Sequence, residues 1–230
     1  MNDGRELVTG LMRQGGLYCL TAEKFSLGRS NEEVVRAMLD AGVKIVQYRE
    51  KTKKMGIKYA ECLVLREMTR AAGAAFIVND DIDLALLVEA DGVHVGQEDL
   101  PVSAVRRLVG DRVAIGLSTH SPEQARAAVA AGADNIGVGP IFATQTKDDV
   151  CAPVGLSYLD FVVAEIELPF TAIGGIKAGN ITQVAAHGAR TITLVTEIVG
   201  ASDIGAMIAS LSLVMATVRA ASDSSGDAAR

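Results

Sequence analysis

The sequence predicts a TIM barrel, in which eight parallel strands alternate with helices in a single α/β domain. Two observations favour this fold. Along the 230 residues, an amphipathic segment, a glycine and a short apolar run follow one another repeatedly, and glycine just past a helix end adopts the left-handed conformation at low cost. The apolar runs are rich in Val and Ile and do not alternate with polar residues, which is typical of parallel strands buried on both faces. Repeated strand–helix alternation on this scale predicts a closed barrel.

The expected strands follow one another at regular intervals. They are residues 17–21, 44–49, 74–79, 93–96, 113–118, 135–139, 169–173 and 191–196. Helix starts lie between them: Ser30 with Glu33 forms a capping-box pattern, and Ser121-Pro122 with Gln124 forms a second. Pro101 and Asn180 suit the same role. An open doubly-wound sheet is the alternative, but it usually carries a GxGxxG turn after its first strand, and no such turn follows Leu20.

Three parts of the chain are expected. Residues 1–14 form a short helix or arm that closes the lower end of the barrel, residues 15–219 form the barrel, and residues 220–230 form a disordered tail because they have no apolar pattern. The long connection at residues 140–153 stands out, since long loops in compact domains are usually functional or disordered.

Composition narrows the class of partner. A net charge of −6 argues against a general nucleic-acid surface. No apolar run approaches the ~18 residues of a membrane span, and the polar start of the chain is unlike a signal peptide. Cys19, Cys62 and Cys151 are widely spaced, which fits free thiols in a reducing cytosol. We therefore expect a cytoplasmic protein that acts on small molecules, with no membrane and no nucleic acid; a homo-oligomer is left open.

Polar residues stand where the expected strands end, and the carboxyl ends of the strands carry function in a TIM barrel. In chain order these residues are Gln47, Arg49 and Lys51; Asn79 and Asp80; Gln97 and Asp99; Ser118, Thr119 and His120; Thr144, Gln145, Thr146 and Lys147; Gly174 and Gly175; Thr196 and Glu197. Cations, carboxylates and hydroxyls are therefore expected on one rim.

The charges on this rim suit two ligands. Asp80 and Asp99 come from neighbouring strands and suit a hard ion such as Mg²⁺, whereas Arg49 and Lys51 suit a polyanion. Together they predict a magnesium diphosphate site. Each carboxylate also has an alternative as a helix N-cap, and each cation as an exposed rim charge. No acid–base pair is evident, and His94 reads as a hydrogen-bonded barrel residue, so the chemistry expected is departure of a leaving group helped by metal and cations.

Six motifs in order resemble one enzyme family. QYREK, VND, GVHVGQED, GLSTH, a Thr-x-Thr-Lys loop and AIGGI, spread over residues 17–198, are similar to the thiamine phosphate synthase family. The resemblance implies a transferase that joins hydroxymethylpyrimidine diphosphate to hydroxyethylthiazole phosphate, or to its carboxylated precursor. The products are thiamine phosphate and diphosphate, and the substitution is dissociative and assisted by one Mg²⁺ per subunit.

The resemblance also assigns residues. It implies pyrimidine diphosphate contacts at Gln47, Tyr48, Arg49, Glu50, Lys51, Asn79, Ser118 and Lys147. It implies thiazole phosphate contacts at Thr144, Gln145, Thr146, Gly175, Val195 and Thr196, and Mg²⁺ ligands at Asp80 and Asp99. The catalytic group is Ser118, Lys147, Arg49 and Lys51. Two departures from the family pattern are the missing prolines of the Thr-x-Thr-Lys loop and the acidic Glu197. The alternatives are a thiazole tautomerase-like isomerase and a non-enzymatic phosphate-ligand binder.

Overall fold

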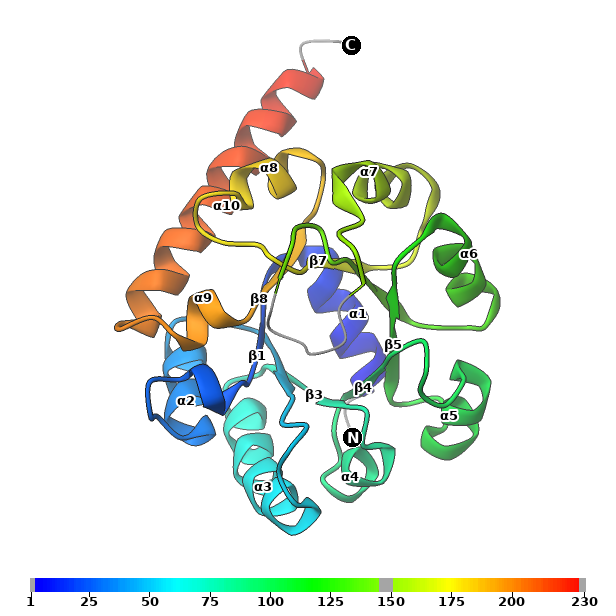
Figure 1. The fold of residues 1–230 in the computed structure, drawn as a ribbon, viewed down its shortest axis with the longest axis vertical. Helices are drawn as coiled ribbons and strands as arrows, with labels where there is room; N and C mark the ends of the chain where they lie inside the picture. Colours follow the sequence, from blue (N-terminus) through cyan, green and yellow to red (C-terminus); the bar gives the residue numbers. More distant parts are fainter. Residues whose placement is uncertain (1–2, 145–150, 228–230) are drawn as a thin grey trace.

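The computed structural model describes residues 3–144 and 151–227, with side chains described as far as residue 221. Over these residues, eight parallel strands close into a barrel in chain order, which confirms the predicted TIM barrel and excludes the open sheet (Figure 1). Each strand overlaps the apolar run that predicted it. The strands are β1 Gly16–Leu20, β2 Ile45–Tyr48, β3 Ala75–Asn79, β4 Gly92–Val95, β5 Ala114–Thr119, β6 Asn135–Val138, β7 Phe170–Ile173 and β8 Thr191–Leu194.

Helices surround the barrel and begin at the expected signals. Ser30 Oγ accepts a hydrogen bond from Glu33 N, and Glu33 accepts one from Ser30 N, which confirms the first capping box. Ser121 caps the next predicted start in the same way. The helices are α1 Gly4–Gln14, η1 Glu23–Phe25, α2 Asn31–Asp40, α3 Met55–Ala71, α4 Ile82–Leu87, α5 Val102–Val109, α6 Pro122–Ala130, α7 Gly155–Glu165, α8 Ile181–Ala186, α9 Thr196–Val199 and α10 Ile204–Asp227.

Side chains along each strand alternate between the barrel interior and the helix layer. Tyr18 and Ile45, which are partners in the β1–β2 register, belong to an inner cluster together with Ile77 of β3. Val46 and Phe76 belong instead to the larger core between strands and helices. With a period of two, the inward set continues from Ile45 through residues 47 and 49 and from Ile77 through residue 79. These inward positions lead up to the carboxyl rim.

α1 closes the amino-terminal end of the barrel, as expected for residues 1–14. Asp3 caps the helix by accepting from Arg5 N and Glu6 N. Val8 and Met12 are buried in the inner cluster, and Figure 1 shows α1 lying across the barrel behind the strands. The polar rim expected from the sequence is at the opposite end, where the strands finish.

Two buried carboxylates stabilise the amino-terminal end of the barrel through ion pairs and hydrogen bonds. Asp134 has a side chain that is 1% exposed, and it accepts from Arg5 Nε (2.5 Å), Arg106 Nη2 (2.5 Å) and Ile115 N (2.7 Å). Asp91 accepts from both terminal nitrogens of the Arg66 guanidinium and from Phe76 N. Each carboxylate stands just before a strand and ties it to the start of the preceding strand and to an outer helix.

The last helix corrects the expectation for the end of the chain. α10 extends to Asp227, so residues 220–227 are helical and not a disordered tail. Its buried residues Ile204, Ile208, Leu211 and Met215 pack on the outer layer of the barrel, and Figure 1 shows its final turns projecting past the barrel. The missing apolar pattern misled the prediction because adding residues to an existing helix costs little, and alanine favours it.

α10 is also apolar. Within the part of the chain that the structure describes, Ile204–Ala221 is the one segment long and apolar enough to cross a membrane by length and composition. The sequence prediction that no apolar run is long enough for a membrane span missed this helix, because Ser, Thr and Gly interrupt its apolar residues. A helix that packs on the core of a soluble protein can have the same length and apolar composition, so this segment is weak evidence for a membrane span.

Removal of the residues after Arg219 should leave stability and turnover nearly unchanged. Arg219 donates to Gln14 O (3.1 Å) and Arg190 O (3.3 Å), and Met215 is the last buried residue of α10 among the side chains described up to residue 221. The truncated chain should melt within about 2 °C of the full chain in a thermal scan followed by circular dichroism. A control truncation after Val214 removes both anchors and should melt clearly lower; equal losses in the two truncations would contradict this expectation.

Candidate active site

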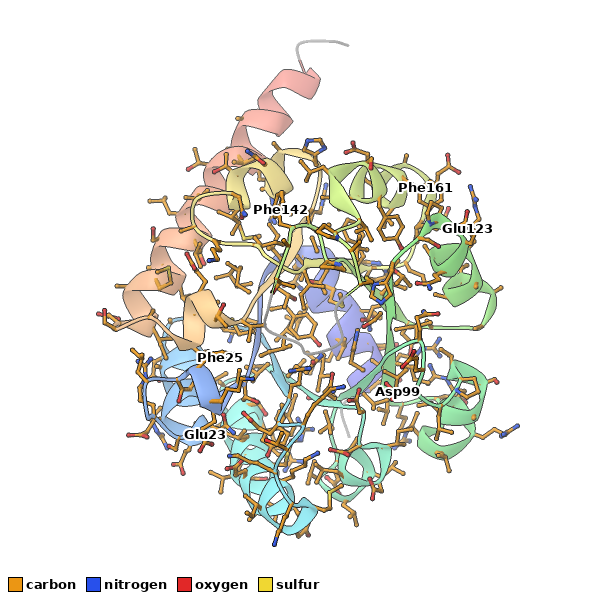
Figure 2. All side chains as sticks on the ribbon, viewed as in Figure 1. Glu23, Phe25, Asp99, Glu123, Phe142 and Phe161 are labelled. Atoms are coloured by element: carbon orange, nitrogen blue, oxygen red, sulfur yellow. The ribbon has the colours of Figure 1, made fainter. Side chains whose placement is uncertain are left out.

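Charged side chains of both signs meet at the ends of β2, β3 and β4. Lys51 Nζ lies 3.2 Å from Asp80 Oδ2, and the carboxylates of Asp80 and Asp99 are close enough to interact directly. Burial raises the pKa of Asp80 above its ordinary value; Lys51 opposes this shift, and the charge of Asp99 adds to it. The two carboxylates predicted to bind one metal ion are therefore neighbours, with a cation beside them (Asp99 is labelled in Figure 2).

Neither Asp80 nor Asp99 is the N-cap residue of the helix that follows it. Asp81, and not Asp80, directly precedes α4, and Pro101 directly precedes α5, so Asp99 is two residues too early. Asp80 has φ 62°, a left-handed conformation that costs a non-glycine residue about 1–2 kcal/mol. Its backbone N donates to His94 O (2.9 Å).

The donor set fits Mg²⁺. Within residues 3–144 and 151–227, no group of three or more His, Cys, Asp or Glu side chains could hold a metal ion. Asp80 and Asp99 are thus a pair of carboxylates and not part of an all-protein cage. Mg²⁺ usually binds proteins through one or two carboxylates and takes its other ligands from water and substrate phosphates. The pair suits an ion that is shared with a diphosphate.

An open cavity of about 150 Å³ lies beside this cluster. Its lining includes four predicted residues and two that were not predicted: Glu50, Lys51, Asn79 and Asp80, with Lys58 and Asp81. Glu50 Oε1 also accepts from Glu23 N (2.9 Å), and Arg49 N donates to Thr21 Oγ1 (2.8 Å). The segment between β2 and α3 is therefore fastened to the segment after β1 on one side and borders the cavity on the other.

Tyr48 does not share this position. Its ring is 1% exposed, its hydroxyl donates to Glu61 Oε2 (2.7 Å), and it belongs to the core between strands and helices. Strand alternation turns this side chain away from the rim, and the implied contact of residue 48 with the pyrimidine diphosphate stays a prediction. Gln47 turns inward, and its Nε2 donates to Tyr18 OH (2.7 Å) inside the barrel.

Ser118 and its neighbours form the next part of the rim. Ser118 Oγ lies 3.0 Å from His94 Nε2, and Gln97 Nε2 donates to Ser118 O (2.6 Å). His94 is thus hydrogen-bonded within the barrel, as predicted. A Cβ at Gly116 would lie 2.5 Å from His94 Nδ1, so the glycine leaves room for the imidazole ring.

The far side of the rim carries the expected thiazole phosphate residues. Gly175 has φ 65°, and a Cβ there would lie 2.5 Å from Ala143 O. Phe142 N donates to Gly174 O (2.9 Å), so the glycine pair accommodates the incoming loop. Val195 and Thr196, at the start of α9, are half-buried, as is Thr144. The acidic Glu197 turns toward the loop after β7, where its Oε1 accepts from Ala178 N (2.9 Å).

Comparison with known proteins decides the family. A model described as thiamine monophosphate synthase matches residues 17–198. The chain belongs to this family. It is 61% identical over 211 residues to the thiamine-phosphate synthase of Pelotomaculum thermopropionicum, covering 92% of this chain and 96% of that protein. It is 52% identical over 198 residues to the thiamine-phosphate synthase of Lawsonia intracellularis, with 86% and 91% covered.

A solved structure agrees with the membership of the thiamine monophosphate synthase family. The thiamine phosphate pyrophosphorylase from Pyrococcus furiosus superposes with a TM-score of 0.82 at 31% identity, covering 90% of this chain and 98% of that one. The match to the family model begins within β1 and ends within α9. Every residue assigned to the rim therefore lies inside the region shared with the thiamine monophosphate synthase family.

Three residues to which the resemblance assigns a role are in the 145–150 segment. Gln145, Thr146 and Lys147 lie outside the described residues. Their roles as thiazole phosphate contacts and as a catalytic cation remain predictions.

Sequence reasoning missed Lys58 and the role of Asp81. Lys58 is buried in the first turns of α3, and its Nζ lies 2.6 Å from Asp81 Oδ2. Asp81 precedes α4 but makes no capping hydrogen bond with its side chain. No local signal could have found this pair, since it depends on how α3 packs against the loop after β3.

Proposed function

We infer that the chain is a thiamine phosphate synthase, a transferase that joins hydroxymethylpyrimidine diphosphate to hydroxyethylthiazole phosphate or its carboxylated precursor. The observation that carries this inference is the cluster of Lys51, Asp80 and Asp99 at adjacent strand ends. It supplies two carboxylates for a divalent ion and a cation for diphosphate, in a barrel of the thiamine monophosphate synthase family.

The near side of the rim is proposed to hold the pyrimidine diphosphate. Arg49 and Lys51 would bind the diphosphate, and Asp80 and Asp99 would hold Mg²⁺. When bound, Mg²⁺ neutralises negative charge on the departing diphosphate. Gln47, fixed by Tyr18, and Ser118, fixed by His94, come from the carboxyl ends of β2 and β5. They are suited to orient the pyrimidine ring by hydrogen bonds.

The reaction we propose needs no strong general base. The carbon–oxygen bond to diphosphate breaks with both electrons leaving on oxygen, and the lone pair of the thiazole nitrogen then attacks the resulting methylene cation. Groups that stabilise the leaving charge do most of the work in such a step. Lys51 is placed for this role, and the resemblance assigns it to Lys147 as well.

The far side of the rim is proposed to hold the thiazole phosphate. β7 lies opposite β3 in the closed barrel, so Gly175, Val195 and Thr196 face the diphosphate site across the barrel mouth. Glu197 directs its charge to the backbone after β7. That placement is compatible with a phosphate beside Thr196.

The two alternatives make different demands. A tautomerase-like isomerase needs neither the metal carboxylates nor the diphosphate clamp, whereas Lys51, Asp80 and Asp99 are present here and in contact. A non-enzymatic phosphate binder would bind both ligands without turnover. The cytoplasm remains our proposed location, supported by Cys19, Cys62 and Cys151, all three of which are free thiols.

Incubation of the purified chain with both substrates and Mg²⁺ tests the function. Thiamine phosphate and diphosphate should appear in equal amounts, as measured by chromatography and a diphosphate assay. EDTA should stop product formation, and added Mg²⁺ should restore it. Isomerisation of the thiazole substrate without the pyrimidine would indicate the isomerase, binding without product would indicate the phosphate binder, and full activity in EDTA would exclude the metal.

A further inference from the structure

Behind the diphosphate side of the rim lies a second group of charged side chains, which we call the Lys53 cluster: Glu23, Asn31, Tyr48, Lys53 and Glu61. Lys53 Nζ forms ion pairs with Glu23 Oε2 and Glu61 Oε1. Glu61 Oε2 accepts from Tyr48 OH (2.7 Å) and from Asn31 Nδ2 (3.1 Å). The cluster therefore joins the end of β2, the segment after β1, and the helices α2 and α3.

The charges in the cluster depend on one another. Burial on its own lowers the pKa of Lys53, but its hydrogen bonds to Glu23 and Glu61 and their charges raise it above the ordinary value. Burial acts to raise the pKa of Glu61, and the hydrogen bonds from Lys53, Tyr48 and Asn31 reverse the shift and lower it. The side chain of Lys53 is only 17% exposed. Its loss would leave two carboxylates without their shared cation.

The cluster anchors the segment that carries the diphosphate cations. Residues 49–54 connect β2 to α3. Arg49 N is bonded to Thr21 at one end of this segment, and Lys53 is bonded to Glu23 and Glu61 near the other. Lys51 lies between these attachments, with a side chain that is 59% exposed and reaches Asp80. Figure 2 labels Glu23 on the segment after β1, beside α2 and α3.

We propose that Lys53 is a positioning residue for diphosphate binding. Its two ion pairs hold residues 49–54 so that Lys51 and Arg49 are directed to the cavity. They also neutralise Glu23 and Glu61, which would otherwise attract Lys51 and Arg49 away from the cavity and repel an incoming diphosphate. This role rests on the proposed function of the rim, and Lys53 itself contacts no substrate.

The test compares Lys53→Met with the unaltered chain. Inorganic diphosphate with Mg²⁺ serves as a competitive inhibitor, so its Ki reports on the cation site without any chemistry. In Lys53→Met the Ki and the KM for the pyrimidine diphosphate should rise about tenfold, by analogy with metal sites, where loss of a residue that orients a ligand costs about 10–100-fold. The KM for the thiazole phosphate should stay within about twofold. Lys53→Arg, which keeps the charge, should recover most of the affinity.

A matched variant on α3, the helix that follows Lys53 and carries Glu61, separates positioning from stability. Arg66→Met breaks the ion pair with the buried Asp91 at the opposite end of the barrel, so it should lower the melting temperature without changing the diphosphate Ki. An equal rise of Ki in both variants would show general destabilisation and overturn the proposal. If Lys53→Met does not fold, Glu61→Gln leaves Lys53 with only one carboxylate and should raise Ki by a smaller factor; an unchanged Ki would overturn the proposal.

Measurements on the wild-type chain distinguish a failure of the positioning role of Lys53 from a failure of the proposed function on which that role rests. A wild-type chain that neither forms thiamine phosphate nor binds diphosphate would refute the proposed function. A wild-type chain that does both, alongside a Lys53→Met variant with the same Ki and KM, would refute the positioning role alone.

Discussion

Asparagine in place of Asp80 should lower kcat about a thousandfold with both substrates and Mg²⁺ at saturation. Removing one group that stabilises developing charge costs up to about this factor, or about 4 kcal/mol of transition-state stabilisation. We expect the full thousandfold loss at Asp80 because it is one of only two carboxylates proposed to bind Mg²⁺. Its loss also leaves Lys51 without its ion-pair partner. Steady-state kinetics over a range of Mg²⁺ concentrations would measure both kcat and the metal requirement.

The substitution is chosen to keep the backbone intact. Asparagine accepts the left-handed conformation of residue 80 more readily than most residues, so Asp80→Asn should melt within about 2 °C of the unaltered chain. Asp83→Asn is the control: Asp83 is exposed in the first turn of α4, and its variant should keep full activity. Full activity of Asp80→Asn would remove residue 80 from the metal site.

Asparagine in place of Asp134 should lower the free energy of unfolding by about 3–5 kcal/mol, the cost of breaking a buried ion pair from one side. Arg5 and Arg106 would both lose their carboxylate at a site where the Asp134 side chain is 1% exposed. For a chain of this size the melting temperature should fall by roughly 10 °C. Urea and thermal unfolding would measure the change, and kcat well below the melting temperature should be unaltered because the site lies at the opposite end of the barrel.

An exposed hydrogen bond of a carboxylate provides the comparison. Asp160 pairs with His187 through a side chain that is 55% exposed, and Asp160→Asn should cost less than about 1 kcal/mol. If both variants lose the same stability, burial of Asp134 is not the cause. If Asp134→Asn loses activity in proportion to stability even at low temperature, the two ends of the barrel are coupled.

The fold could be predicted because its signals are local. A glycine after a helix and an aliphatic run after that glycine placed six of the strands, and apolar runs alone placed β1 and β7. Ser30 marked the start of α2 through its own side chain. The end of α10 was wrong because helix propagation is cooperative and leaves little trace in the residues that join last. Local patterns therefore predict where elements begin better than where they end.

The site could be predicted only in part. The proximity of Asp80 and Asp99 could be predicted from topology, because neighbouring parallel strands end on the same rim. Tyr48 was grouped with its neighbours because a motif was carried over as a block, whereas the alternation that aligns residues 47, 49 and 51 turns its side chain to the opposite face. Lys53 and Lys58 could not be assigned, because their partners Glu23, Glu61 and Asp81 come from elements whose packing no sequence period describes.

The glycine pair after β7 has a consequence for redesigning substrate preference. Any side chain at position 175 would meet the carbonyl oxygens of Phe142 and Ala143, so enlarging the residue would push the loop that leads to Thr144. A substitution library directed at the proposed thiazole phosphate side of the rim could not vary the β7 end and this loop independently. Thr196, at the start of α9, is the position where a side chain could be exchanged while that backbone stays in place, whereas Glu197 holds the loop after β7 through Ala178 N.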